Sequence, residues 1–143
     1  MVKQRLTSFP ILAHFDPTLP SIIETDASDY AVGAIHSQIQ KNGPVHPVAF
    51  LSRKFFPAEM KYNIHDKELV AIVLAFQEWI YQLKSCEQHI LVWTDHKNLE
   101  YFTTSKVLSR RHARWSEFSA EFDVIVRYRP GNKNGKPNTL SRR

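Results

Sequence analysis

One carboxylate, Glu68, lies on the apolar side of a stretch that otherwise predicts an ordinary helix. The apolar residues that mark this side recur at helical spacing: Ile64, Ala71, Ile72, Ala75, Phe76, Trp79 and Leu83. Glu68 comes four residues after Ile64 and four before Ile72, so its side chain points the same way. A carboxylate that faces a core must be paired, protonated or bound to a metal. The fold therefore has to provide a partner for Glu68.

The segments around this helix predict an α/β domain. Asn63 is the expected N-cap, with Asp66 in the first turn. Three antiparallel strands are expected before it, at residues 22–25, 30–39 and 46–52, with a hairpin turn at Lys41-Asn42-Gly43. A fully buried strand at 90–93 is typical of a parallel arrangement. Helices at 97–102, 109–122 and 137–142 and a strand at 124–128 complete the order βββαβ(α)αβα, a mixed five-stranded sheet with helices packed on it.

Length and composition favour one domain with a sizeable core. The chain has 143 residues, and residues 1–20 carry three prolines, so we expect a connecting segment at 1–20 and the domain at 21–143. The single cysteine, Cys86, excludes an internal disulfide and a cysteine-based zinc site. No apolar run approaches the length of a membrane span.

The charge of the chain is uneven along its length. The formal net charge is +5, from 19 Lys and Arg against 14 Asp and Glu, and the excess lies in the C-terminal third. Such a surface suits a polyanion such as nucleic acid. On charge alone, a merely soluble surface explains the excess equally well.

Two further acids, Asp26 and Asp95, lie at the ends of predicted strands. If those strands are neighbours, both side chains point to one place, and a helix packed over the sheet brings Glu68 between them. Oxygen ligands of this kind favour Mg²⁺ or Mn²⁺, and two such ions form the usual clamp for phosphodiester hydrolysis. Each acid also has an alternative role that the sequence leaves open. Asp26 could cap a turn and Asp95 could cap the helix after it. Glu68 could pair with Lys67, His65 or an arginine.

Six motifs along the chain together resemble one known family. In order they are Glu24-Thr25-Asp26-Ala27-Ser28, Pro47-Val48-Ala49-Phe50-Leu51-Ser52-Arg53-Lys54, Tyr62-Asn63-Ile64-His65-Asp66-Lys67-Glu68-Leu69, Thr94-Asp95-His96-Lys97-Asn98-Leu99, Arg114-Trp115 and Tyr128-Arg129-Pro130-Gly131-Asn132. This pattern resembles the ribonuclease H domain of reverse transcriptases from LTR retrotransposons of the Ty3/gypsy class. The resemblance covers nearly the whole chain.

The resemblance implies an RNase H-like fold and two-metal cleavage of the RNA strand of an RNA–DNA hybrid. Asp26, Glu68 and Asp95 match the family's first three catalytic, metal-binding acids, with Mg²⁺ as the ion and Mn²⁺ as its substitute. The implied partners are the hybrid and the polymerase portion of the same polyprotein, with no membrane and with dimerisation through the full-length enzyme. The implied location is a cytoplasmic virus-like particle or the nucleus.

The family's fourth catalytic acid is replaced in this chain. It normally comes in a segment like Lys-(Ala/Pro)-Asp-Ala-Leu-Ser-Arg, and here Asn138 occupies the Asp position. Asparagine keeps a carbonyl oxygen but loses the charge, so we expect weaker binding of the second ion and slower cleavage. Three explanations of this change compete. They are mutational drift in an old copy of the element, an engineered substitution, and a domesticated protein that keeps the fold for another purpose. A catalytically weakened module that binds nucleic acid or a protein is therefore the alternative function.

Contacts with nucleic acid are expected on three parts of the chain. The segment from residue 106 to 115 is basic with aromatic residues between, which suits hybrid phosphates. The alternative is that its arginines form only a solvated face. The expected contact residues are Ser28, Lys97, Asn98, Arg110, Arg111 and Arg114.

Overall fold

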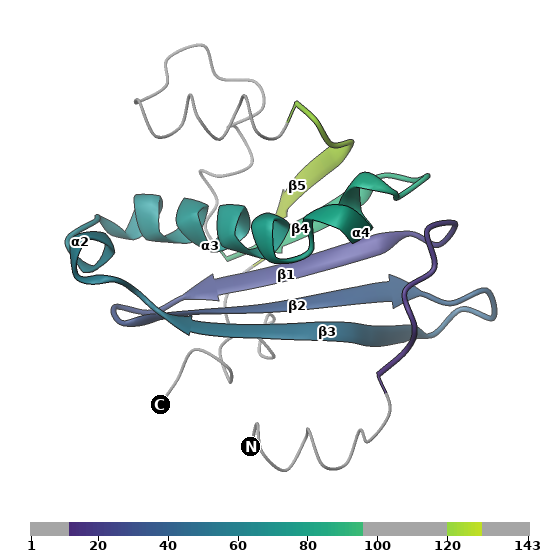
Figure 1. Ribbon diagram of the computed structural model, residues 1–143, viewed down its shortest axis with the longest axis horizontal. Helices are drawn as coiled ribbons and strands as arrows, with labels where there is room; N and C mark the ends of the chain where they lie inside the picture. The colour runs from purple at the N-terminus through teal and green to yellow at the C-terminus, as the bar shows by residue number, and fades with distance from the viewer. Residues whose placement is uncertain (1–11, 96–119, 130–143) are drawn as a thin grey trace.

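The computed structural model describes residues 12–95 and 120–129, which contain a five-stranded mixed sheet (Figure 1). The strand order is β3-β2-β1-β4-β5, with β1 in the centre. β1 pairs antiparallel with β2 and parallel with β4, while β5 pairs parallel with β4. The predicted mixed sheet is confirmed. The strand bounds are Ser21–Ala27, Ala31–Ile39, Val45–Lys54, Ile90–Thr94 and Val124–Tyr128 for β1 to β5.

The turn between β2 and β3 forms where the sequence predicts it. The Gly43 N–H donates to the Gln40 carbonyl at 2.9 Å, and the Gln40 N–H donates to the Pro44 carbonyl at 2.9 Å. Gly43 has a φ of 106°, a left-handed value that only glycine adopts without strain. Asn42 keeps a negative φ, so the glycine alone provides the special conformation of this turn.

The predicted long helix divides into two. α3 (Ile64–Glu78) begins at Asn63, whose side chain accepts a hydrogen bond from the Asp66 N–H at 2.8 Å, so the predicted N-cap is confirmed. The helical geometry is interrupted at Trp79, where φ is −111° and ψ is 31°, and α4 (Ile80–Lys84) follows. A short helix that the sequence did not predict, α2 (Pro57–Met60), precedes α3 and has proline at its first position.

The main core lies between α3 and one face of the sheet (Figure 1). Ile72 and Phe76 of α3 are buried there with Ile23 of β1 and Val92 of β4. Burial of an apolar side chain of this size stabilises a fold by about 1.5–3 kcal/mol. The predicted burial of Ile64 is wrong: this first residue of α3 is 46% exposed.

The strand β4 is buried on alternate residues rather than throughout. Ile90, Val92 and Thr94 are buried, whereas Leu91 and Trp93 are half-buried on the opposite face. The prediction of a fully buried strand is therefore wrong on that face, while its parallel pairing on both sides is confirmed.

The segment before β1 packs against the end of the sheet. The Gln38 amide accepts from the Asp16 N–H at 2.9 Å and donates to the Asp16 and Leu19 carbonyls at 2.8 and 3.3 Å. Leu19 is 8% exposed, and the Phe15 ring lies 5.7 Å from that of His36. Residues 12–20 therefore contact the sheet closely, while the boundary expected between residues 20 and 21 stays a prediction.

Several predicted helices lie outside the described residues. These are 97–102, 137–142 and most of 109–122, of which the described end, residues 120–122, forms a turn and a bend. Within the part of the chain that the structure describes, no helix is long and apolar enough to cross a membrane.

Candidate metal centre

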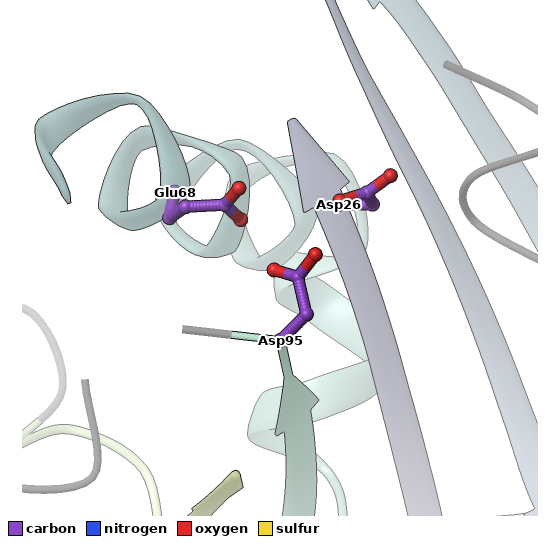
Figure 2. A group of neighbouring side chains, drawn as sticks. All are labelled: Asp26, Glu68 and Asp95. Atoms are coloured by element: carbon purple, nitrogen blue, oxygen red, sulfur yellow. The ribbon is translucent and has the colours of Figure 1, made fainter. Parts of the chain in front are cut away.

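Three acids from distant parts of the chain meet at one end of the sheet (Figure 2). Asp26 lies near the end of β1, Asp95 directly follows β4, and Glu68 comes from the second turn of α3. One carboxylate oxygen from each residue lies within 4.8 Å of the others. The convergence expected from the sequence is therefore present in the fold.

The order of the strands explains why Asp26 and Asp95 are neighbours. β1 and β4 are adjacent and parallel, so their carboxyl ends meet at the same edge, where polar side chains of α/β sheets line functional crevices. Asp26 is still held in the β1–β2 ladder opposite Gly33. α3 packs against β1, which brings Glu68 to the same edge.

Glu68 is the most constrained of the three acids. Glu68 is 3% exposed, and its Oε2 atom has no hydrogen-bond partner among the described residues. Burial, and after it the nearby carboxylates of Asp95 and Asp26, together raise the pKa of Glu68 to about 9, against an opposing hydrogen bond from the Ala27 backbone. Without a cation this carboxyl group holds a proton at neutral pH.

A lysine next to Glu68 has another partner. The Lys67 Nζ donates to the Asp29 carbonyl at 3.0 Å and lies 5.6 Å from the centre of the Phe55 ring. It thereby joins α3 to the turn that follows β1. Sequence reasoning considered Lys67 only as a counter-ion for Glu68 and missed this contact.

The donor set fits a hard divalent cation. All three side chains offer carboxylate oxygens, two of the residues are buried and the third is half-buried. Mg²⁺ and Mn²⁺ prefer such ligands, and a cation would give the unpartnered Oε2 of Glu68 the partner it lacks. The observed acidic cluster is consistent with the expected metal site.

Of the other expected site residues, only Ser28 lies within the described part of the chain. Its hydroxyl accepts from the Tyr30 and Ala31 N–H groups at 3.2 and 3.1 Å and lies 3.3 Å from the Ala31 carbonyl. The hydroxyl thus organises the turn after β1, and its contact with nucleic acid stays a prediction. The residues outside the described ranges are Lys97, Asn98, Arg110, Arg111, Arg114 and Asn138.

Comparison with known proteins identifies the family. Residues 16–122 match the sequence model of the RNase H-like domain found in reverse transcriptase. The chain belongs to this family. It is also 38% identical over 143 residues to the Tf2-3 and Tf2-4 transposon polyproteins of Schizosaccharomyces pombe. The match covers 99% of this chain and 11% of each polyprotein, so the chain spans about a tenth of the length of these polyproteins.

Solved structures share the fold of this RNase H-like domain. A foamy viral protease-reverse transcriptase in complex with an RNA/DNA hybrid superposes with a TM-score of 0.65 at 21% identity, over 89% of this chain and 18% of the viral one. The RNase H1 of Halobacterium salinarum gives a TM-score of 0.59 at 14% identity, over 86% of this chain and 93% of its own. LC11-RNase H1 in complex with an RNA/DNA hybrid gives 0.61 at 13% identity, over 86% and 93% of the two chains.

Proposed function

We propose that this domain hydrolyses the RNA strand of RNA–DNA hybrids endonucleolytically, with divalent metal ions, during the reverse transcription of a retrotransposon. The observation that carries the proposal is the convergence of Asp26, Glu68 and Asp95 within 4.8 Å, at the carboxyl ends of two parallel strands of an RNase H-like sheet. Three ionised carboxylates at this spacing would repel one another, and a cation would relieve the repulsion.

Each of the three acids has a role in this proposal. Asp26, Glu68 and Asp95 would hold the metal ions, whose chemistry is to activate a water molecule and to stabilise the leaving 3′ oxygen. Glu68 would release its proton when a cation binds, because the pKa of Glu68 in the metal-free protein is about 9 and the carboxyl group is therefore protonated before binding. The fold brings the three carboxylates together before a cation binds, so little reorganisation is needed on binding.

An RNA–DNA hybrid is the substrate that the observations favour. Two structural neighbours were solved with an RNA/DNA hybrid. The C-terminal third of the chain is basic, which suits contact with phosphates. Such a hybrid would be recognised by its shape and its 2′-hydroxyl groups rather than by its sequence.

The surroundings proposed for the domain follow from its relatives. Since the S. pombe relatives are transposon polyproteins, we infer that the polymerase portion of a reverse transcriptase is the covalent neighbour of this domain. A virus-like particle in the cytoplasm is its proposed location. Dimerisation through the full-length enzyme and a nuclear location stay predictions.

One residue favours a second function, in which the domain binds nucleic acid or a protein without efficient cleavage. Asn138 stands where the family has its fourth acid, and it supplies a neutral oxygen in place of a charged one. The second of the two proposed ions would be held more weakly. This function predicts binding of the hybrid with slow or no hydrolysis.

Cleavage of a labelled RNA–DNA hybrid in Mg²⁺ and in Mn²⁺ distinguishes the two functions. The unaltered chain is compared with Asn138→Asp and with Asp26→Asn. Cleavage by the unaltered chain that Asp26→Asn abolishes would mean that three acids suffice. Activity only after Asn138→Asp would mean that one substitution disabled a sound enzyme. Binding of the hybrid with no cleavage by either chain would refute the enzymatic proposal and favour the binding module.

A further inference from the structure

Arg129 directly follows β5 and joins this strand to both β4 and β1. Its backbone N–H donates to the Thr94 carbonyl at 2.8 Å, which continues the β4–β5 pairing beyond Tyr128. Its guanidinium carbon lies 4.8 Å from the centre of a Trp93 ring, and its Nη2 atom donates to Glu24 Oε2 at 2.7 Å. One side chain thus crosses β4 to reach the central strand.

The two residues that Arg129 contacts form a register pair. Glu24 lies opposite Trp93, and among the described residues this is the last pair of the β1–β4 ladder. Asp26 and Asp95 each come two residues later. Since the ladder ends before them, its hydrogen bonds do not set the separation of the two acids.

Repulsion between the acids acts at the place where the ladder has ended. Their oxygens lie within 4.8 Å, so the metal-free site tends to push the ends of β1 and β4 apart. The contact between Arg129 and Glu24 opposes this movement. It is a charge-assisted hydrogen bond between side chains that are 27% and 14% exposed, and it is therefore partly protected from water.

The chemistry of arginine suits this position better than that of lysine. A planar guanidinium can stack on an aromatic ring and at the same time donate hydrogen bonds in its own plane. An ammonium group is a compact point charge and has no flat surface to stack. Arg129 uses both capacities, on Trp93 and on Glu24.

We propose that Arg129 is a positioning residue for the metal centre, which holds Asp26 and Asp95 at the separation that cations require by joining Glu24 of β1 to Trp93 of β4. This inference rests on the proposed function, because it assigns metal binding to the three acids. Residues that orient metal ligands typically change metal affinity by roughly 10-fold to 100-fold when they are removed.

Binding of Mn²⁺ by calorimetry tests the inference without relying on cleavage. Arg129→Met should weaken binding of Mn²⁺ by roughly 10-fold or more, and Arg129→Lys should weaken it less. Glu24→Gln, which changes little in shape, should act in the same direction. The double variant should be no worse than Arg129→Met, because both changes remove one interaction.

Cleavage then separates positioning from catalysis. In Arg129→Met the Mg²⁺ concentration for half-maximal rate should rise by a similar factor, while the rate at saturating Mg²⁺ and the KM for the hybrid stay near those of the unaltered chain. Unchanged metal affinity in both folded Arg129→Met and folded Glu24→Gln would overturn the inference, even if both variants unfold more readily.

Arg127→Met is the matched control. Arg127 lies on β5 two residues before Arg129, is exposed, and lies opposite Trp93 in the β4–β5 register. Removing it takes away the same charge without touching the Glu24 contact, so metal affinity should not change. Equal losses in Arg127→Met and Arg129→Met would show a general charge effect and refute positioning. If Mn²⁺ binds as expected and no hybrid is cleaved, the proposed function fails while the inference stands.

Discussion

Carboxylate oxygens of Glu68 and Asp95 lie within 4.8 Å of each other, although one residue comes from a helix and the other follows a strand. Asp95 is the largest electrostatic cause of the raised pKa of Glu68, after burial. When both are ionised in the metal-free protein, the two acids therefore repel each other, and a cation bound between them removes this repulsion. Stability, pH and metal binding are coupled at this site.

Replacement of Glu68 by glutamine should stabilise the metal-free protein at neutral pH. The pKa of Glu68 rises from 4.5 in the unfolded chain to about 9 in the folded one. The contribution of the protonated carboxyl group to the free energy of unfolding is therefore fully present below pH 4.5 and is lost as the pH rises toward 9. At pH 7, Glu68→Gln should raise the free energy of unfolding by up to roughly 3 kcal/mol. Urea unfolding with a chelator, at about pH 5 and about pH 8, measures this.

The same substitution at an exposed position of α3 provides the control. Glu78 is exposed near the end of the helix, so Glu78→Gln should leave the dependence of stability on pH unchanged. Glu68→Gln should also abolish cleavage of the hybrid. A Glu68→Gln chain that is less stable than the unaltered one at pH 8 would contradict the raised pKa of the buried Glu68 carboxyl group.

Addition of Mg²⁺ should stabilise the folded chain and release a proton. A ligand at ten times its Kd raises the free energy of unfolding by about 1.4 kcal/mol, and Asp26→Asn should lose most of this gain. Glu68 is protonated before binding and ionised after it, so calorimetry in buffers of different ionisation enthalpy should report roughly one proton released at pH 7. Identical heats in all buffers would refute the protonated state of Glu68.

Acid should destabilise the fold through His36. Burial lowers the pKa of His36 from 6.5 to about 4, and a nearby Gln82 side chain offsets part of the shift. The stability from neutral His36 is complete above pH 6.5 and is lost as the pH falls toward 4, by roughly 2–3 kcal/mol. His36→Gln keeps a hydrogen-bonding group for the Ser21 hydroxyl, which lies 3.0 Å from the imidazole Nε2, and should lose less stability between these pH values.

A histidine on the neighbouring strand tests whether this effect belongs to the buried site. His46 of β3 is exposed, so His46→Gln should leave the acid sensitivity as it is. Thermal unfolding followed from about pH 7 to about pH 4 compares the three chains. Parallel curves for the unaltered chain and His36→Gln would exclude His36 as the source.

Removal of residues 1–20 should cost far more stability than removal of residues 1–11. A chain that begins at Leu12 keeps the contacts of Phe15, Asp16 and Leu19, whereas a chain that begins at Ser21 leaves the buried Gln38 amide without those partners. An unsatisfied buried amide costs about 1–3 kcal/mol, and loss of buried Leu19 adds about 2 kcal/mol. Denaturant unfolding of both shortened chains checks this, and equal stabilities would place the boundary at residue 20.

Local features of the structure could be predicted because they depend on neighbouring residues. Asn63 caps α3 through its own side chain, Gly43 adopts the left-handed turn, and the helical spacing places Glu68 on the buried side. The break in the helix at Trp79 carries no proline or glycine to predict it. The positions of Asp26 and Asp95 at strand ends suggested a common site, but only as a condition on the order of the strands.

The sequence by itself determined the apolar spacing of α3, the turn chemistry and the three acids that a functional site would use. Only the tertiary structure decided that β1 lies beside β4, that the carboxylates meet within 4.8 Å, that Gln38 holds Asp16, and that Arg129 reaches Glu24. The physical reason is the range of the interactions. Backbone conformation responds to residues a few positions away, whereas Arg129 and Glu24 are 105 positions apart and become neighbours only after the strands have paired.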